Sequence, residues 1–297
     1  MIVARKLNKK YGKTRAIKDL DLYVKKGQIH GLIGPEACGK TTVLRILSTL
    51  IRPDSGEVTI NDIPLGKGLD IRKIVGYVPK TPYLPKDYTA RELVGFAASL
   101  HGIQDRNFTE SILKQLGLES VADQRLDRFS QAMEKNVAFA IACVHKPLVL
   151  LLDEPMASLD PVSKKKIREF LLASNKTVLL TGQDLDTVDG LCNSVTVMRS
   201  GSVIVDGEMA SIRQQIGKGA IEIRLYDVGQ TQKLLFELEK NRAKVTVSGE
   251  SIYVHYKNDS EIPGIMKIAA GAADIIDARP VKISIDDIFA KYHPVEK

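Results

Sequence analysis

Residues 34–42 read "GPEACGKTT" and are the most informative stretch of the chain. They complete the pattern G-x-x-x-x-G-K-[ST] from Gly34 to Thr41, in which glycines let backbone amides approach phosphate oxygens. The strand-like run "QIHGLIG" precedes this stretch, and "TVLRILSTLI", with apolar residues at helical spacing, follows it. A strand, this loop and a helix in that order predict a phosphate-binding loop, because the helix N-terminus adds partial positive charge.

The residues around the loop predict an α/β fold. Short β-rich runs alternate with helical periodicity up to about residue 215, a pattern typical of a mainly parallel sheet covered by helices. The run "PLVLLLDEP" (147–155) is apolar until it ends in two acids, as expected of a central buried strand. Further strands are predicted in "KTVLLTGQ" (176–183) and in "SVTVMRSGSVIVDG" (194–207), the second with a hairpin at Ser200-Gly201.

Two stretches together predict nucleotide chemistry. Lys40 is placed to reach the β and γ phosphates, and the Thr41 hydroxyl to ligate Mg²⁺. At the end of the apolar run, Asp153 would hold the Mg²⁺ shell and Glu154 would polarise the attacking water as general base. The combination indicates a nucleotide-hydrolysing site.

The composition changes after residue 215. Residues 216–297 carry 12 basic and 12 acidic residues, whereas residues 1–215 carry 31 and 24. The second segment has the order strand, helix, hairpin turning at Gly249, helix, strand, which predicts a small ferredoxin-like domain. The run "SIDDIFAKY" (284–292) predicts a final helix because a serine and acids open it.

Composition also narrows the class of protein. No charge-free apolar run reaches the length of a membrane span and the N-terminus lacks a signal-peptide pattern, so we expect a cytosolic protein. Cys38, Cys143 and Cys192 have no metal-ligand spacing, and their odd number does not support a disulfide framework. We expect the last two to be buried thiols and Cys38, beside the phosphate site, to be the reactive one.

Several motifs carry a family resemblance over nearly the whole chain. The sequence resembles the ATP-binding subunit of an ABC transporter, of the exporter type that ends in a small C-terminal domain. The matching segments are "KKYGKTRAIKDLDLYVKKGQIHGLIGP", "IVGYVPK", "RFSQAMEKNVAFAIACVHKP", "LLLDEPMASLDP", "LLTGQDLDTV" and "ISIDDIF". The resemblance implies a P-loop NTPase of the ABC ATPase type over residues 1–215, with a helical subdomain at about 82–145, followed by the C-terminal domain at 216–297.

The resemblance also implies roles for individual residues. Tyr11 would stack on adenine, and Ser130 would donate to the γ-phosphate of a nucleotide bound by a partner subunit. ATP would be bound by Tyr11, Gly34, Pro35, Glu36, Ala37, Cys38, Gly39, Lys40, Thr41, Thr42, Ser130 and Asp160. Mg²⁺ would be held by Thr41 and Asp153, and the catalytic positions would be Glu154, Gln183 and Lys80.

The same positions depart from the family pattern. Lys80 stands where the family has a glutamine, and since an ammonium is repelled by a metal we expect it to turn toward phosphate or solvent. Gln183 stands at the histidine position and cannot relay a proton. The signature Leu-Ser-Gly-Gly is replaced by Phe129-Ser130-Gln131-Ala132, Asn136 replaces an arginine, and Ala37 replaces a glycine. Binding is therefore expected to be better kept than turnover.

Three functions remain open from the sequence. The first is a transport ATPase subunit, peripheral on the cytoplasmic face of the membrane, that drives separate permease subunits through a homodimer or heterodimer and turns over slowly. Its loop after Lys80, "TPYLPKDYTARELVGFAASLHG", would meet the permease. The second is a catalytically impaired, ATP-binding regulatory partner in a heterodimer. The third, an ATPase acting on nucleic acid, rests only on the basic first segment, and no nucleic acid is expected because no aromatic-basic RNA motif is present.

Overall fold

The computed structural model describes residues 1–157, 159–183, 188, 190–216 and 219–281. The chain folds into two compact units, Met1–Gly207 and Glu208–Lys297. The boundary predicted after residue 215 falls near the end of helix α8 (Met209–Ile216), which groups with the second unit.

The first unit contains a six-stranded sheet of order β10-β9-β3-β8-β7-β6. Neighbouring strands from β9 to β6 pair in parallel, as predicted, and β10 joins the edge through the turn at Ser200-Gly201, where both residues have positive φ. The strands are β3 (Ile29–Ile33), β6 (Val75–Val78), β7 (Val149–Leu152), β8 (Thr177–Gly182), β9 (Ser194–Arg199) and β10 (Ser202–Glu208). Because β3, β7 and β8 are buried along their whole length, their apolar residues show no alternation.

A second sheet in the same unit is antiparallel, with order β2-β1-β4-β5, and the sequence patterns did not predict it as a separate sheet. Its strands are β1 (Ile2–Tyr11), β2 (Thr14–Val24), β4 (Ser55–Ile60) and β5 (Ile63–Pro64). Its apolar face packs with α1 (Lys40–Leu47) in a core that includes Leu20, Val43 and Leu179. This packing seats the phosphate loop between the two sheets.

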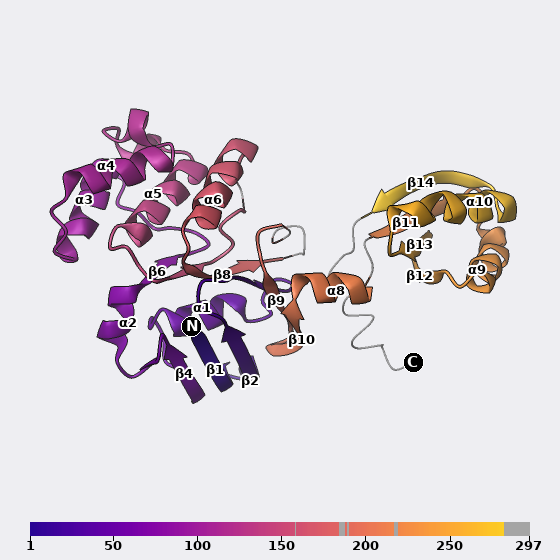
Figure 1. Cartoon of the computed structure of the whole chain (residues 1–297), viewed down its shortest axis with the longest axis horizontal. Helices are drawn as coiled ribbons and strands as arrows, with labels where there is room; N and C mark the ends of the chain where they lie inside the picture. The colour runs from indigo at the N-terminus through magenta and orange to yellow at the C-terminus, as the bar shows by residue number, and fades with distance from the viewer. Residues whose placement is uncertain (158, 184–187, 189, 217–218, 282–297) are drawn as a thin grey trace. The chain divides into compact units, whose positions relative to one another are not determined.

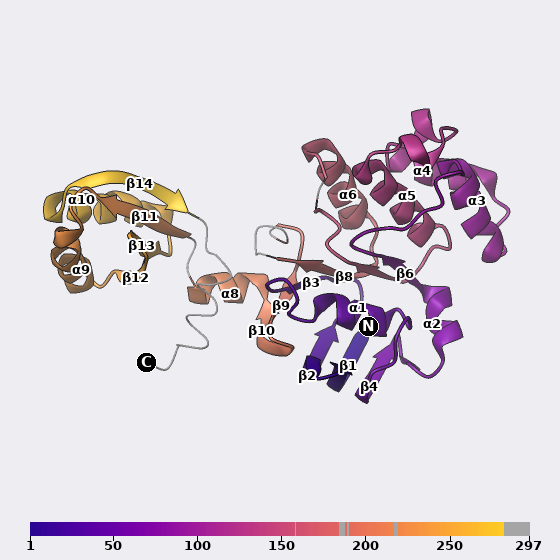
Figure 2. The same cartoon turned by 180° about the vertical axis from the view of Figure 1, so that it is seen from behind.

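Helices cover the other face of the parallel sheet. Figures 1 and 2 show α5 and α6 on the side of the parallel sheet opposite to α1 and the antiparallel strands. The helices are α2 (Gly68–Ile74), α3 (Ala90–Leu100), α4 (Arg106–Gln115), α5 (Gln131–Cys143) and α6 (Pro161–Ala173), with short 3₁₀ turns η1 (Glu119–Val121) and η2 (Leu126–Arg128). No strand intervenes between β6 and β7 in this described stretch, as expected of a helical subdomain at about 82–145.

The second unit has the predicted ferredoxin-like order. Its antiparallel sheet runs β12-β13-β11-β14, and α9 and α10 supply Leu234, Leu238, Ile265 and Ala269 to its core. The elements are β11 (Gly219–Leu225), η3 (Val228–Gln230), α9 (Thr231–Lys240), β12 (Lys244–Ser248), β13 (Ser251–Tyr256), η4 (Asp259–Glu261), α10 (Ile262–Ala272) and β14 (Ile275–Val281). The helix predicted at 284–292 lies outside the described residues.

Candidate functional site

The phosphate loop joins the end of β3 to the start of α1, in the predicted strand, loop, helix order. Gly39 precedes the helix with φ +110°, and a Cβ added there would lie 2.3 Å from the Ala16 carbonyl oxygen. A Cβ added at Gly34 would lie 2.3 Å from the carbonyl oxygen of Met198. A side chain at either position would clash with the backbone of a neighbouring strand, so both positions require glycine even without a bound phosphate.

Lys40 is buried at the base of this loop, with 5% of its surface exposed. Its ammonium donates to the carbonyl oxygens of Gly34 at 2.6 Å and Pro35 at 2.7 Å. These bonds hold a positive charge inside the curve of the loop. An anion with several oxygens is the ligand that complements a buried ammonium surrounded by backbone amides.

The loop forms one wall of a cavity of about 390 Å³. This cavity brings together predicted residues from four distant stretches of the chain. It is lined by Tyr11, Ala16, Glu36, Ala37, Cys38, Gly39, Lys40, Thr41, Thr42, Lys80 and Glu154. Tyr11 is 46% exposed and so presents its ring to a ligand, as a stacking role requires.

Six predicted residues lie outside the lining: Gly34, Pro35, Ser130, Asp153, Asp160 and Gln183. Two of them are helix caps. Ser130 caps the N-terminus of α5 by accepting from the backbone N–H of Met133 at 3.3 Å, and its side chain lies on the surface. Asp160 caps α6, accepting from the backbone N–H groups of Val162 at 2.9 Å and Ser163 at 3.0 Å. Within this subunit both are helix caps, and neither faces the cavity.

Glu154 lies in the cavity with a constrained backbone. Its φ is +45°, in the left-handed region that a side chain rarely adopts, at a cost of roughly 1 kcal/mol. The Glu154 N–H donates to the Thr181 hydroxyl at 2.8 Å, and the Glu154 carbonyl accepts from the Lys135 ammonium at 2.5 Å. These two bonds hold the backbone and so aim the carboxylate into the cavity.

Asp153 precedes Glu154 and is fully buried. One carboxylate oxygen, Oδ1, accepts from the Thr181 hydroxyl at 2.8 Å. The other, Oδ2, is buried without a hydrogen-bond partner in the described part of the chain. Because an unpaired buried carboxylate oxygen is costly, this atom fits a cation or a cation-bound water.

Lys80 lines the nucleotide cavity and pairs there with two acids, an arrangement that the sequence did not predict. Its ammonium lies 3.1 Å from Oε1 of Glu154 and 3.1 Å from Oε1 of Glu36. The hydrogen bond to Glu154, followed by the one to Glu36, raises the pKa of Lys80, and Lys80 in turn lowers the pKa of Glu36. The assigned general base is therefore paired with a cation before any nucleotide is considered.

Gln183 completes the same group of side chains. Its amide nitrogen lies 3.3 Å from Oε2 of Glu154 and 3.3 Å from Oε1 of Glu36. Lys80 and Gln183, which depart from the family pattern, thus both contact the assigned base, and both also contact Glu36. We call Glu36, Lys80, Glu154 and Gln183 the acid–lysine cluster.

The expectation that Cys38 is a reactive thiol is wrong. The side chain is buried, and desolvation raises the pKa of Cys38 more than the nearby Lys40 ammonium lowers it. Burial also raises the pKa values of Cys143 and Cys192, each to about 12. All three thiols are therefore protonated at neutral pH.

Sequence reasoning missed Lys135 and Thr181. Lys135 lies on α5, is 4% exposed, and its pKa is lowered by burial to about 8. Thr181 lies next to the last residue of the buried strand β8 and links Asp153 to Glu154. The available signals were a lysine among the small and apolar residues of α5 and a hydroxyl inside an apolar run. Asn136, next to Lys135, is also buried and donates to the Leu116 carbonyl.

Ala37 adopts φ +58°, so its methyl group is strained where a glycine would be free. Ala37→Gly is expected to stabilise the chain by roughly 1 kcal/mol, read as a higher urea midpoint by circular dichroism. The matched control is Ala97→Gly in helix α3, where glycine should instead destabilise by about 1 kcal/mol. A lower midpoint for Ala37→Gly would show that the loop tolerates this φ without strain.

Comparisons with known proteins agree with this geometry. Residues 17–157 match the family model described as ABC transporter. The chain is 33% identical over 263 residues to the Nod factor export ATP-binding protein I of Bradyrhizobium sp. (strain SNU001), covering 86% of this chain and 85% of the relative. It is 34% identical over 227 residues to the daunorubicin resistance ATP-binding protein DrrA2 of Streptomyces coeruleorubidus, covering 74% of this chain and 70% of that one.

Solved structures extend the agreement to three dimensions. The chain matches a dimeric ATP-binding cassette in a post-hydrolysis state with bound ADP and Pi, with TM-score 0.66 and 26% identity, over 70% of this chain and 99% of the other. It also matches an ATP-binding subunit of an ABC transporter with TM-score 0.67 and 26% identity, over 72% and 92% of the two chains. The chain therefore belongs to the ABC transporter ATP-binding proteins and is a nucleotide-binding ATPase subunit of that family.

Proposed function

We propose that this subunit binds Mg-ATP in the cavity beside Lys40 and hydrolyses it slowly. The observation that carries the proposal is the pairing of Lys80 with Glu154 at 3.1 Å. The ammonium occupies a carboxylate oxygen of Glu154 that would otherwise face the attacking water, so it competes with the contact that a general base must make. ATP binding depends on the loop and on Lys40, which the acid–lysine cluster leaves intact.

The donors present fit Mg²⁺. In our proposal the Thr41 hydroxyl and the unpaired Oδ2 of Asp153 hold the ion, and phosphate oxygens and water supply the other ligands. Bound Mg²⁺ would neutralise phosphate charge. Within the described residues no group of three or more His, Cys, Asp or Glu side chains is arranged so that it could hold a metal ion by itself.

The transport role requires other chains. The described part of the chain contains no helix that is both long and apolar enough to cross a membrane. We propose that separate permease subunits dock at the segment after Lys80, on the cytoplasmic face. Aromatic and apolar side chains are exposed there, including Tyr83 at 96%, Phe96 at 63% and Leu100 at 71%. Relatives named for Nod factor export and daunorubicin resistance support an export role.

A dimer is the second assembly that we propose, since a related cassette is dimeric in its solved structure. Its partner is a second copy of this chain or another ATP-binding subunit. The exposed Gln131 at the start of α5 favours pairing with another ATP-binding subunit. A side chain at that point keeps a nucleotide bound by the facing subunit at a distance. In that case the chain would regulate a more active partner.

Lys80→Gln tests whether the ion pair between Lys80 and Glu154 slows ATP hydrolysis. The substitution removes the cation beside Glu154 and is expected to raise steady-state ATPase by about tenfold, since 1.4 kcal/mol corresponds to a factor of ten. The control is Lys73→Gln, an exposed lysine whose ion-pair partner is Asp70 on its own helix. An unchanged or lower rate for Lys80→Gln, with Lys73→Gln at the starting rate, would refute inhibition by the ion pair.

A further inference from the structure

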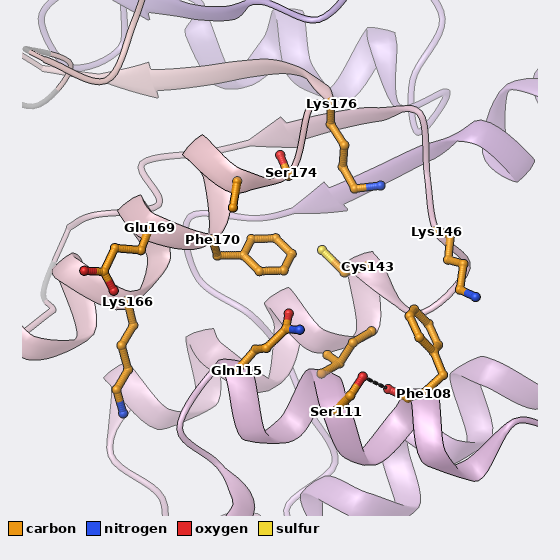
Figure 3. Close-up of a pocket in the computed structure, with 12 residues that line it drawn as sticks. Phe108, Ser111, Gln115, Cys143, Lys146, Lys166, Glu169, Phe170, Ser174 and Lys176 are labelled. Carbon is orange, nitrogen blue, oxygen red and sulfur yellow. Dashed lines mark hydrogen bonds between the residues drawn. The ribbon is translucent and has the colours of Figure 1, made fainter.

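A second cavity, of about 470 Å³, lies in the first unit, where α4, α5 and α6 meet the residues that lead into β7 and β8 (Figure 3). Among the described residues, none that line it also line the nucleotide cavity. Its volume falls within the range of small-molecule sites, about 300 to 1,000 Å³. The proposed function gives this cavity no role.

Two aromatic rings and a thiol belong to the apolar part of the cavity wall. Figure 3 shows the ring of Phe170 on one side and that of Phe108 on the other, with Cys143 between them. Phe170 is held edge-on by the fully buried ring of Phe139, with centroids 6.0 Å apart and an interplanar angle of 86°. The thiol of Cys143 stays neutral because burial raises its pKa to about 12. A flat or aliphatic body fits between such walls.

Positive charge surrounds this apolar space. Lys146, Lys166 and Lys176 line the cavity, and the Lys146 ammonium lies 4.1 Å from the centroid of the Phe108 ring. The single lining carboxylate belongs to Glu169, whose ion-pair partner is Lys165, outside the lining, at 3.9 Å. In the described part of the chain no carboxylate pairs with the three lining lysines. The cavity therefore carries uncompensated positive charge.

Lys176 gives a second sign of a missing anion. Its ammonium is half-buried and donates to the Pro147 carbonyl at 2.5 Å, and desolvation lowers the pKa of Lys176. In the described part of the chain this half-buried ammonium has a neutral carbonyl and no carboxylate as its partner, so it lacks the counter-charge that burial normally demands. An anion bound in the cavity would supply that charge.

We propose that this cavity binds a small amphipathic anion, in which an acidic group is attached to an apolar body. The apolar body lies between Phe108 and Phe170. The acidic group pairs with a lining lysine at the edge of the cavity, where Figure 3 shows Lys146, Lys166 and Lys176 on separate sides. The ligand class follows from charge complementarity and from the aromatic walls, and it is independent of the turnover proposed for the nucleotide site.

The purified full chain is titrated with 1-anilinonaphthalene-8-sulfonate, whose fluorescence reports transfer to an apolar site, and the bound probe is then competed with decyl phosphate. We expect saturable binding of one probe per chain and displacement by decyl phosphate. Decyltrimethylammonium should compete at least about tenfold more weakly because its charge is repelled, and inorganic phosphate should compete weakly because it has no apolar body.

Paired variants locate the site. Lys146→Gln with Lys166→Gln removes two lining charges and is expected to weaken probe binding at least about tenfold. The control, Lys114→Gln with Lys164→Gln, removes two exposed charges from α4 and α6 outside the lining and should leave binding unchanged. Saturating Mg-ATP should not displace the probe. The proposal would be overturned if probe binding did not saturate or if the cationic amphiphile competed as well as decyl phosphate. Displacement of the probe by ATP, or equal weakening of binding in the control pair, would also overturn it.

Discussion

Glu154→Gln lowers steady-state ATPase by at least about 100-fold and leaves ATP affinity within a few fold, if Glu154 is the base. The glutamine amide cannot accept the proton of the attacking water, but it has nearly the same size as the glutamate side chain. It also keeps an oxygen that can accept from Lys80, which now lies 3.1 Å from the carboxylate. Phosphate release at saturating Mg-ATP and fluorescent-nucleotide binding measure the two effects.

The matched control for this variant is Glu57→Gln, which makes the same change on the exposed surface of β4, outside the nucleotide cavity. Its turnover should equal that of the starting protein. Turnover of Glu154→Gln at the control rate would exclude Glu154 as the base. A variant that does not hydrolyse ATP keeps it bound. A larger sedimentation coefficient of Glu154→Gln with ATP than without it would therefore show that two copies of this chain assemble.

Lys40→Ala abolishes detectable ATP binding, an expected loss of at least about 100-fold in affinity. The buried ammonium is the only cation of the lining other than Lys80, among the described residues, and Lys80 is engaged by two acids. Removing Lys40 leaves the Gly34 and Pro35 carbonyls without their donor, so circular dichroism must first show that the chain is folded.

Lys40→Arg keeps the charge and separates binding from loop stability. It should bind ATP more weakly than the starting protein but more tightly than Lys40→Ala, whereas the surface variant Lys73→Ala should bind normally. If folded Lys40→Ala bound ATP as tightly as Lys73→Ala, the cavity would not be the nucleotide site.

Local pattern predicted the elements that build the site. The order of strand, loop and helix around residues 34–42 is visible in hydrophobic spacing, and the acids at 153 and 154 follow a continuous apolar run. The antiparallel sheet escaped prediction because its strands β1, β2, β4 and β5 are interrupted in the sequence by β3, which belongs to the parallel sheet, and by α1. Which strands pair is decided by packing across the core, and single-strand periodicity does not encode it.

The acid–lysine cluster could not be predicted for a related reason. Residues 36, 80, 154 and 183 are far apart in sequence, and their side chains meet only because four loop or strand ends converge at one edge of the sheet. The resemblance marked Lys80 and Gln183 as unusual, but it did not indicate that Glu36 would contact either of them. The misjudged reactivity of Cys38 has a similar origin, because burial depends on the tertiary fold whereas the adjacent Lys40 is visible in the sequence.

The burial of Cys38, Cys143 and Cys192 has a practical consequence for watching this subunit at work. Because all three thiols are buried and protonated, the folded chain offers maleimide reagents little background. A single cysteine engineered at the exposed Tyr83 would then be the reactive position, without prior removal of the native ones. Fluorescent or spin labels placed there could follow the approach of a permease or a second subunit in the otherwise unaltered sequence.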